Sequence, residues 1–300
     1  MSLQGELGYR DDDVLVIAHV DDIGMHPDET EGALDVLRFG LARTGSAMVP
    51  APDFARFAEI WARDPSLDIG IHVTLNSEWP TYRWRPLLSR EDVPSLYDPA
   101  GFFWDREPAF RLHADTGEAV REMEAQVEKV LSMGLSPTHL DPHMGCFYYR
   151  RDIFTAAVRL ARRYGLIIPY APVGMLEPLR ERGFVVADTF NGFYEIEGEE
   201  SDPGLRSAAY QSWLRGLEPG VHFLYLHPAK VTPGLAELIE TPYLRAGDRE
   251  FWTSAAARNL SAELGIHFIG LREMQALQRD RKSTRLNSSH EIPSRMPSSA

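Results

Sequence analysis

The chain has 300 residues, of which 44% are hydrophobic and 25% charged, values typical of a globular protein with a buried core. Its net charge of −13 argues against a nucleic acid or an anionic membrane as partner, because both require a basic surface. A single cysteine excludes an intrachain disulfide, and the sequence contains neither a recognisable signal peptide nor a membrane-spanning stretch. We therefore expect a cytoplasmic protein in a reducing compartment.

Strand-like and helical patterns alternate along the chain. The first strand is expected at residues 14–20 and the first helix at residues 29–41. The further expected strands are 45–49, 67–75, 138–143, 167–170, 185–189, 221–227 and 266–269, and the further helices are 52–63, 116–133, 151–164, 176–182, 207–217, 255–264 and 271–279. This alternation indicates a parallel α/β sheet, and the number of units suggests a closed or nearly closed (β/α) barrel. A doubly wound open sheet is the alternative, and the pattern alone does not separate the two.

Two segments depart from this alternation. Residues 77–113 are rich in aromatic residues and proline, and we interpret them as an insertion into a single domain that spans residues 1–280. Residues 281–300 are rich in Ser and Arg and show no periodicity, which predicts a disordered tail. Their run STRLNSSH resembles translated sequencing-adapter tails, which indicates an artefact rather than natural sequence.

Side chains with metal-binding chemistry recur at or near the ends of several expected strands. They are Asp21, Asp22, His72, His139, Asp141, His143 and His227. The carboxyl ends of parallel strands meet at one edge of a sheet, so we expect these side chains in one region. Each has an ordinary alternative: a solvated turn for the aspartate pair, a core histidine for His72, and a structural hydrogen-bond cluster for the His-x-Asp-x-His run. Their conjunction at one edge favours a functional site.

Carboxylate and imidazole together suit Zn²⁺ and neighbouring divalent metals. Three protein ligands leave coordination positions for water and a substrate oxygen, as a catalytic metal requires. A cation would also offset the repulsion between Asp21 and Asp22. One of the two could then ligate while the other accepts a proton; the residues alone leave open which does which.

The segments HVDDIG, GIHVTL, THLDPH and LYLHPAKVTP, in this order, resemble the YdjC/ChbG-type (ChbG/HpnK) carbohydrate deacetylases. The resemblance extends over about residues 14–277. It implies an irregular TIM-like barrel that uses a divalent metal, Mg²⁺ or Zn²⁺, to remove an acetyl group from an N-acetylated sugar or oligosaccharide. Carried over position by position, it implies that Asp22, His72 and His143 bind the metal, that Asp21 is the general base and that His227 is the general acid.

Further residues are implied around this set. By the same resemblance Asp141 would shape the site and His139 would be structural. In the insertion, Trp79, Tyr82 and Trp84 offer aromatic faces on which a sugar could stack, with packing of the insertion onto the barrel as the alternative.

The chain also departs from the family pattern. The family's third motif continues with further histidines, whereas Met144 and Gly145 follow His143 here, so the family's sugar preference is not carried over. Two alternative functions are a metal-dependent hydrolase of another amide or ester and an inactive metal-binding homologue. A sugar-phosphate isomerase is disfavoured, because the late segment EPGVHF is too poor in glycine to grip a phosphate. The oligomeric state is left open, with a homodimer as one alternative.

Overall fold

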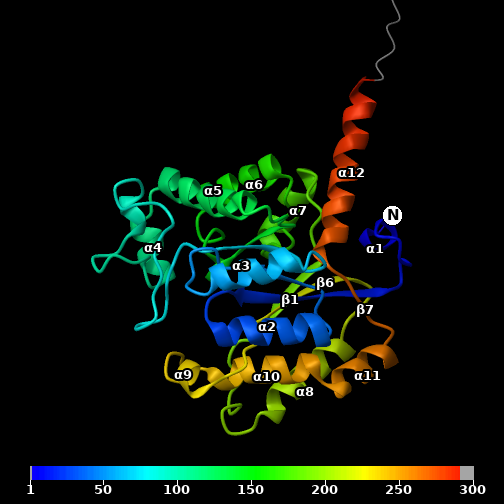
Figure 1. The fold of residues 1–300 in the computed structure, drawn as a ribbon. Helices are drawn as coiled ribbons and strands as arrows, with labels where there is room; N and C mark the ends of the chain where they lie inside the picture. The colour runs from blue at the N-terminus through cyan, green and yellow to red at the C-terminus, as the bar shows by residue number, and fades with distance from the viewer. Residues whose placement is uncertain (1, 291–300) are drawn as a thin grey trace, which may run out of the picture.

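The computed structural model describes residues 2–290, with side chains as far as residue 281 (Figure 1). Its centre is a seven-stranded sheet in the order β4-β3-β2-β1-β6-β5, with β7 paired to the first part of β1, and all of these pairs are parallel. The strands are β1 (Val14–Ile23), β2 (Thr44–Ala47), β3 (Asp68–Val73), β4 (Leu140–Pro142), β5 (Thr189–Gly192), β6 (Gly220–Leu226) and β7 (His267–Phe268). This half-barrel confirms the expected α/β class.

Single backbone hydrogen bonds continue the half-barrel from β4 round toward β6. The N–H of Leu140 donates to the carbonyl of Ile167 at 2.9 Å, and the N–H of Ala187 donates to that of Pro169 at 2.9 Å. The N–H of Asp188 then donates to a β6 carbonyl at 2.7 Å. The sheet is therefore curved almost into a ring, as the barrel prediction required.

The strands expected at residues 167–170 and 185–189 are reduced in the structure. The first makes only an isolated bridge between Ile167 and His139, and the second is replaced by β5, which begins at Thr189. Pro169 has no N–H to donate, so a regular ladder cannot run through this segment.

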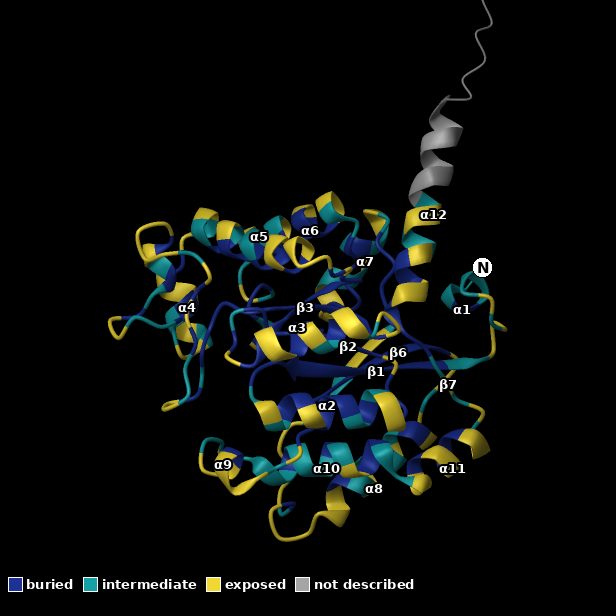
Figure 2. Ribbon diagram, viewed as in Figure 1, coloured by how far each residue is buried: buried dark blue, intermediate teal, exposed yellow. Residues whose placement is uncertain are grey.

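Helices surround the sheet, with buried faces toward the strands and exposed faces outward (Figure 2). This arrangement follows from the helical spacing of apolar residues. In helix α2 (Pro27–Phe39), for example, Ala33 and Val36 lie about one turn apart and are both buried. The others are α1 (Leu3–Glu6), α3 (Phe54–Arg63), α4 (Glu107–His113), α5 (Thr116–Ser132), α6 (Arg151–Tyr164), α7 (Val173–Glu181), α8 (Gly204–Arg215), α9 (Pro233–Ala236), α10 (Pro242–Thr253), α11 (Ala255–Glu263) and α12 (Leu271–His290), with short 3₁₀ turns η1 (Pro94–Leu96) and η2 (His143–Gly145). Of these, α1, α4, α9 and α10 were not expected from the sequence, and α10 contributes to the site below.

The insertion at residues 77–113 contains η1 and α4 and is fastened to the barrel by a buried carboxylate. The side chain of Glu122 in α5 accepts from the backbone N–H groups of Leu87 and Leu88 at 3.0 and 3.1 Å. Since Glu122 is fully buried, these bonds and the surrounding aromatic side chains hold the insertion against the sheet.

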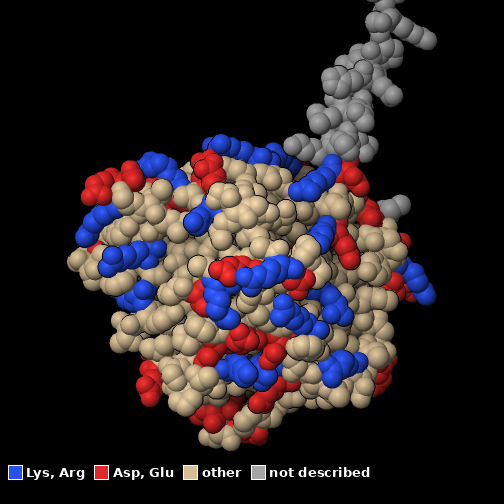
Figure 3. Space-filling model, in the orientation of Figure 1, with Lys and Arg blue, Asp and Glu red and all other residues tan. Residues whose placement is uncertain are grey.

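The C-terminal segment differs from its prediction. Helix α12 continues to His290, beyond the helix end expected at residue 279, and no Gly or Pro interrupts the sequence from Leu271 until Pro293. Residues 291–300 lie outside the described residues. Among the residues that the structure describes, no helix combines the length and the apolar character that a bilayer crossing requires. On the face drawn in Figure 3, basic side chains are interspersed with acidic ones.

Candidate active site

A bulge near the end of β1 brings both aspartates to one cavity. The sequence pattern suggested that Asp21 and Asp22 follow the first strand. In the structure β1 extends to Ile23, so both aspartates lie inside it. The pairing of β1 with β2 changes register between Val20 and Ile23, and Asp22 has a φ of 60°, which residues other than glycine rarely adopt. Neighbouring side chains of a regular strand point to opposite faces, whereas here both carboxylates line the same cavity. Such backbone strain costs about 1–3 kcal/mol and is typical of functional sites.

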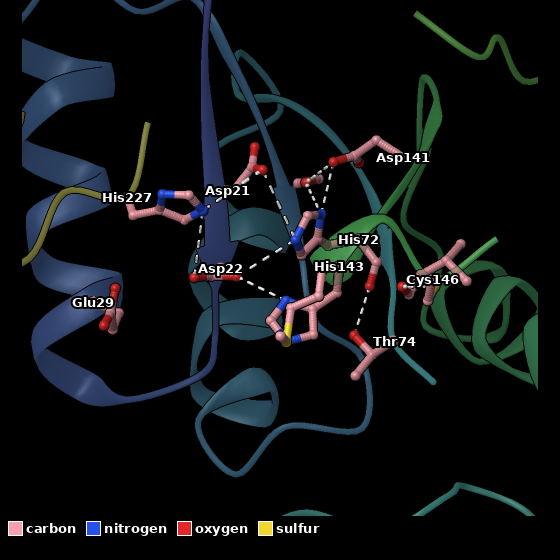
Figure 4. A network of polar contacts seen from close by, with 12 residues as sticks. Asp21, Asp22, Glu29, His72, Thr74, Asp141, His143, Cys146 and His227 are labelled. Carbon is pink, nitrogen blue, oxygen red and sulfur yellow. Dashed lines mark hydrogen bonds and ion pairs between the residues drawn. The ribbon is translucent and has the colours of Figure 1, made fainter. Parts of the chain in front are cut away.

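Three buried side chains from different strand ends meet at one point. Oδ1 of Asp22 lies 3.1 Å from Nδ1 of His143 and 3.4 Å from Nε2 of His72. One ligand atom from each of the three residues lies within 4.8 Å of the other two. Figure 4 shows the carboxylate of Asp22 with both rings turned toward it. The structure therefore brings together the three residues predicted as metal ligands.

Each of the two imidazoles is held from behind by a second carboxylate. Nδ1 of His72 lies 2.6 Å from Oδ2 of Asp141, and Nε2 of His143 lies 3.0 Å from Oε2 of Glu78. A carboxylate accepts the N–H of the nitrogen that it contacts, so the carboxylates behind fix both rings with their other nitrogens toward Asp22. This carboxylate–histidine arrangement is the usual support of a metal-binding histidine.

The electrostatics of the cluster favour added positive charge. Burial opposes a charge on either imidazole, but the surrounding carboxylates outweigh it and raise the pKa of His143 to about 9 and that of His72 well above its ordinary value. Burial likewise opposes ionisation of Asp22, but three imidazoles and Arg245 outweigh it and lower its pKa well below the usual range. One carboxylate and two imidazole nitrogens, in surroundings that stabilise a cation, fit a borderline divalent metal.

Asp21 and His227 flank this group. One oxygen of Asp21, Oδ1, lies 2.6 Å from Nδ1 of His19, while Oδ2 lies 3.9 Å from Nε2 of both His72 and His227. Nε2 of His227 is also 3.8 Å from Oδ2 of Asp22. Burial lowers the pKa of His227, and the two aspartates oppose this only in part.

A buried ionic cluster fixes the backbone at His227. Its N–H donates to Oδ2 of Asp248 at 2.9 Å, and Oδ1 of Asp248 lies 2.9 Å from Nη1 of Arg206. Arg206 also pairs with Glu199 at 2.8 Å, and all three charged side chains are almost fully buried. The strand end that carries His227 is therefore joined to α8 and α10.

Sequence reasoning missed three charged residues of the site. Arg245 of α10 contacts Oδ2 of Asp22 at 3.0 Å and Oε2 of Glu29 at 2.8 Å, and Glu78 supports His143. Burial raises the pKa of Glu29 to about 8, although Arg245 opposes the shift. A signal for α10 was present in the proline at its start and in the helical spacing of its apolar residues. The sequence offers no comparable signal for Glu78.

The site opens into a cavity of about 400 Å³. Trp79 lines it, as expected of a sugar-stacking residue, whereas Tyr82 packs beside His26, and Trp84 is buried and donates to the carbonyl of Asn76. Neither Tyr82 nor Trp84 lines the described cavity, so the predicted subsite is reduced to Trp79. Further aromatic side chains that the sequence did not single out line the cavity: Tyr148, Tyr149, Tyr170, Phe190, Tyr194 and Tyr225.

Comparisons with known proteins identify relatives over most of the chain. The model of the YdjC-like protein family matches residues 15–263. A carbohydrate deacetylase from Thermus thermophilus is 35% identical over 240 residues, covering 78% of this chain and 84% of the relative. A carbohydrate deacetylase from Geobacillus stearothermophilus is 29% identical over 262 residues, covering 87% of this chain and 98% of the relative.

Among solved structures, a protein from Enterococcus faecalis V583, provisionally named a cellobiose-phosphate cleavage protein, shares the fold. Its TM-score is 0.73 at 24% identity, over 87% of this chain and 99% of that one. The family match, which spans most of the chain, and the identity to the Thermus relative together show that the chain belongs to the YdjC-like protein family.

Proposed function

We propose that the chain is a metal-dependent hydrolase that removes the acetyl group from an N-acetylated sugar, releasing acetate and a free amino sugar. One observation carries the proposal: Asp22, His72 and His143 converge at a cavity that Asp21 and His227 also line. The carbohydrate deacetylases among the relatives support acetylated sugars as the substrate class.

The chain's own residues would move the protons. Oδ1 of Asp21 is engaged by His19, so Oδ2 is the oxygen free to accept the proton of the attacking water. His227 would donate a proton to the nitrogen of the leaving amine as the C–N bond breaks, and burial, by lowering its pKa, makes its imidazolium a stronger acid.

Asp22, His72 and His143 would hold a divalent cation, Mg²⁺ or Zn²⁺. When bound, that cation would polarise the amide carbonyl and increase the acidity of a nearby water. Asp141 and Glu78 would keep the two imidazoles oriented, and Trp79 would provide a face for the sugar ring.

The test compares two isosteric variants of neighbouring residues. Purified protein is analysed for metal and assayed for acetate release from mono- and di-N-acetylglucosamine, before and after treatment with a chelator. Asp22→Asn should lose the metal, whereas Asp21→Asn should keep it and lose about 10²–10⁴-fold in kcat.

Three results would count against the proposal. Loss of metal in Asp21→Asn, with retention in Asp22→Asn, would exchange the roles of the two aspartates. Turnover that withstands complete metal removal would refute metal dependence. A metal-loaded protein that releases no acetate from any sugar in a broad set of N-acetylated sugars would refute sugar deacetylation and favour another amide or ester.

A further inference from the structure

Behind Asp21, a chain of buried hydrogen bonds runs through the interior of the barrel. Nδ1 of His19 contacts Asp21 at 2.6 Å, and Nε2 of His19 lies 2.7 Å from Nε2 of His139. Nδ1 of His139 lies 2.9 Å from Oγ1 of Thr138, which lies 2.7 Å from Oδ1 of Asp68. Both histidine rings are fully buried, so no solvent competes for these bonds.

The series of hydrogen bonds ends at Asp68, which is bonded to the start of α12. Oδ2 of Asp68 accepts from the backbone N–H groups of Leu271 and Arg272, each at 2.7 Å. Two amide donors at the start of a helix stabilise an ionised carboxylate. Asp68 is therefore an acceptor at both of its oxygens.

The series of hydrogen bonds requires one proton more than two neutral imidazoles carry. Because Asp68 accepts, the hydroxyl of Thr138 must donate to it, and Nδ1–H of His139 must then donate to Thr138. At the other end, an ionised Asp21 accepts from Nδ1–H of His19. If both imidazoles were neutral, two lone pairs would face each other at 2.7 Å between the Nε2 atoms, so one further proton must lie there.

The surroundings of the pair are tightly packed and carry negative charge, which fits a shared proton. A Cβ at Gly70 would lie 2.3 Å from Nε2 of His139, so the ring rests against the β3 backbone. Oδ1 of Asp141 lies 3.7 Å from the same nitrogen and has no hydrogen-bond partner among the described residues, and it provides negative charge. Burial, with His19, lowers the pKa of His139 well below its ordinary value, which agrees with one proton for the pair and not two.

The other neighbours of the pair are few. His19 faces the Phe223 ring of β6 at 5.0 Å, and His72 of β3 adds a weaker repulsion toward His139. The charged groups that act on the shared proton are therefore Asp21 at one end and Asp141 at the side.

We propose that His19 is a positioning residue for Asp21: it shares one buried proton with His139 and holds Oδ1 of Asp21, so that Oδ2 faces the reacting water. The proposal rests on the proposed role of Asp21 as base. The protonation of the pair can be measured without substrate, so its failure and that of the proposed function are distinguishable.

The first experiment is ¹⁵N NMR of the histidine rings in the metal-loaded protein, with His139→Gln used to assign the pair. We expect an imidazolium-type proton between the two Nε2 atoms, retained to about pH 8, where a free histidine with a pKa of about 6.5 is neutral. Ordinary neutral tautomers in both rings at that pH would overturn the proposal, whether or not any variant folds.

The second experiment measures kcat and KM separately in His139→Gln. The glutamine amide can donate an N–H to His19, so that the extra proton is no longer needed and His19 holds Asp21 as a neutral imidazole. A neutral donor holds a carboxylate less firmly than an imidazolium does, so kcat should fall while KM and metal content stay unchanged.

The matched control is His222→Gln, since His222 is another buried histidine of the sheet but bonds to Thr189 and a backbone carbonyl, away from the pair. Its kcat and KM should match those of the unmodified protein. An unchanged kcat in His139→Gln, or an equal fall in the control, would overturn the proposal.

Discussion

Replacing Asp141 by Asn tests how far the supporting carboxylate contributes to metal binding. Oδ2 of Asp141 accepts from Nδ1 of His72 at 2.6 Å and from Oγ of Ser46 at 3.1 Å, whereas Oδ1 has no hydrogen-bond partner among the described residues. The amide oxygen of Asn can take the place of Oδ2, and its NH₂ group can take that of Oδ1. The variant therefore keeps the shape of the site and removes only the charge.

The expected effect follows from that loss. Removing the carboxylate behind a metal-binding histidine typically weakens metal affinity by about 10–100-fold, which corresponds to about 1.4–2.7 kcal/mol. We expect a loss in this range for Asp141→Asn, with most of kcat retained at saturating metal, because His72 keeps its Nε2 turned toward Asp22.

The assay is a Zn²⁺ titration of chelator-treated protein, by calorimetry or by competition with a chromogenic chelator. Asp152→Asn is the control, since Asp152 pairs with Arg150 on the surface of α6 and should leave the affinity unchanged. Unaltered affinity in Asp141→Asn, or equal losses in both variants, would refute the argument that this carboxylate supports a metal-binding histidine.

Other outcomes can be checked with the same protein. Burial opposes a charge on His143 and on His72, but carboxylates outweigh it and raise the pKa of both, that of His143 to about 9. A metal must therefore displace protons below these values, and affinity should rise by at least about tenfold per pH unit between about pH 6 and pH 8. A flat titration series would contradict this. Arg206→Met should lower the free energy of unfolding, measured in urea, by about 3–5 kcal/mol, because it leaves two buried carboxylates without their cation. The control Arg215→Met breaks an exposed ion pair and should lower it by less than about 1 kcal/mol. Similar losses in the two variants would refute the argument from burial. Gly70→Ala should lower the free energy of unfolding by about 1–3 kcal/mol, since its Cβ would lie 2.3 Å from Nε2 of His139. The control Gly174→Ala, whose Cβ would have no atom within 4 Å, should leave the unfolding midpoint unchanged or slightly higher.

Much of the site could be predicted from local patterns. Asp22, His72 and His143 each lie at or near the carboxyl end of an expected strand, and parallel strands bring these ends to one edge whatever the details of the barrel. The geometry that places both Asp21 and Asp22 in the cavity could not be predicted in the same way. It depends on a bulge that the strand pattern conceals, because the period of two assumes a regular ladder.

The charges around the metal-binding group were decided by the tertiary structure. Glu78 and Arg245 have the sequence context of surface residues, one in the insertion and the other on a helix that was not expected. They become partly buried only when the insertion and α10 pack at the ends of the strands. A charge is stable there because its partner, from a distant segment, is buried with it.

The position of His19 depends on both the sequence pattern and the tertiary structure. Strand periodicity alone places His19 and Asp21 on one face of β1, two residues apart. His139 is 120 residues further along the chain, and its Nε2 lies 2.7 Å from Nε2 of His19. This contact follows only from the packing of β1 against the other strands inside the barrel. Periodicity is a local property of the chain, whereas the partners of a buried polar group are chosen by the segments that exclude water from it.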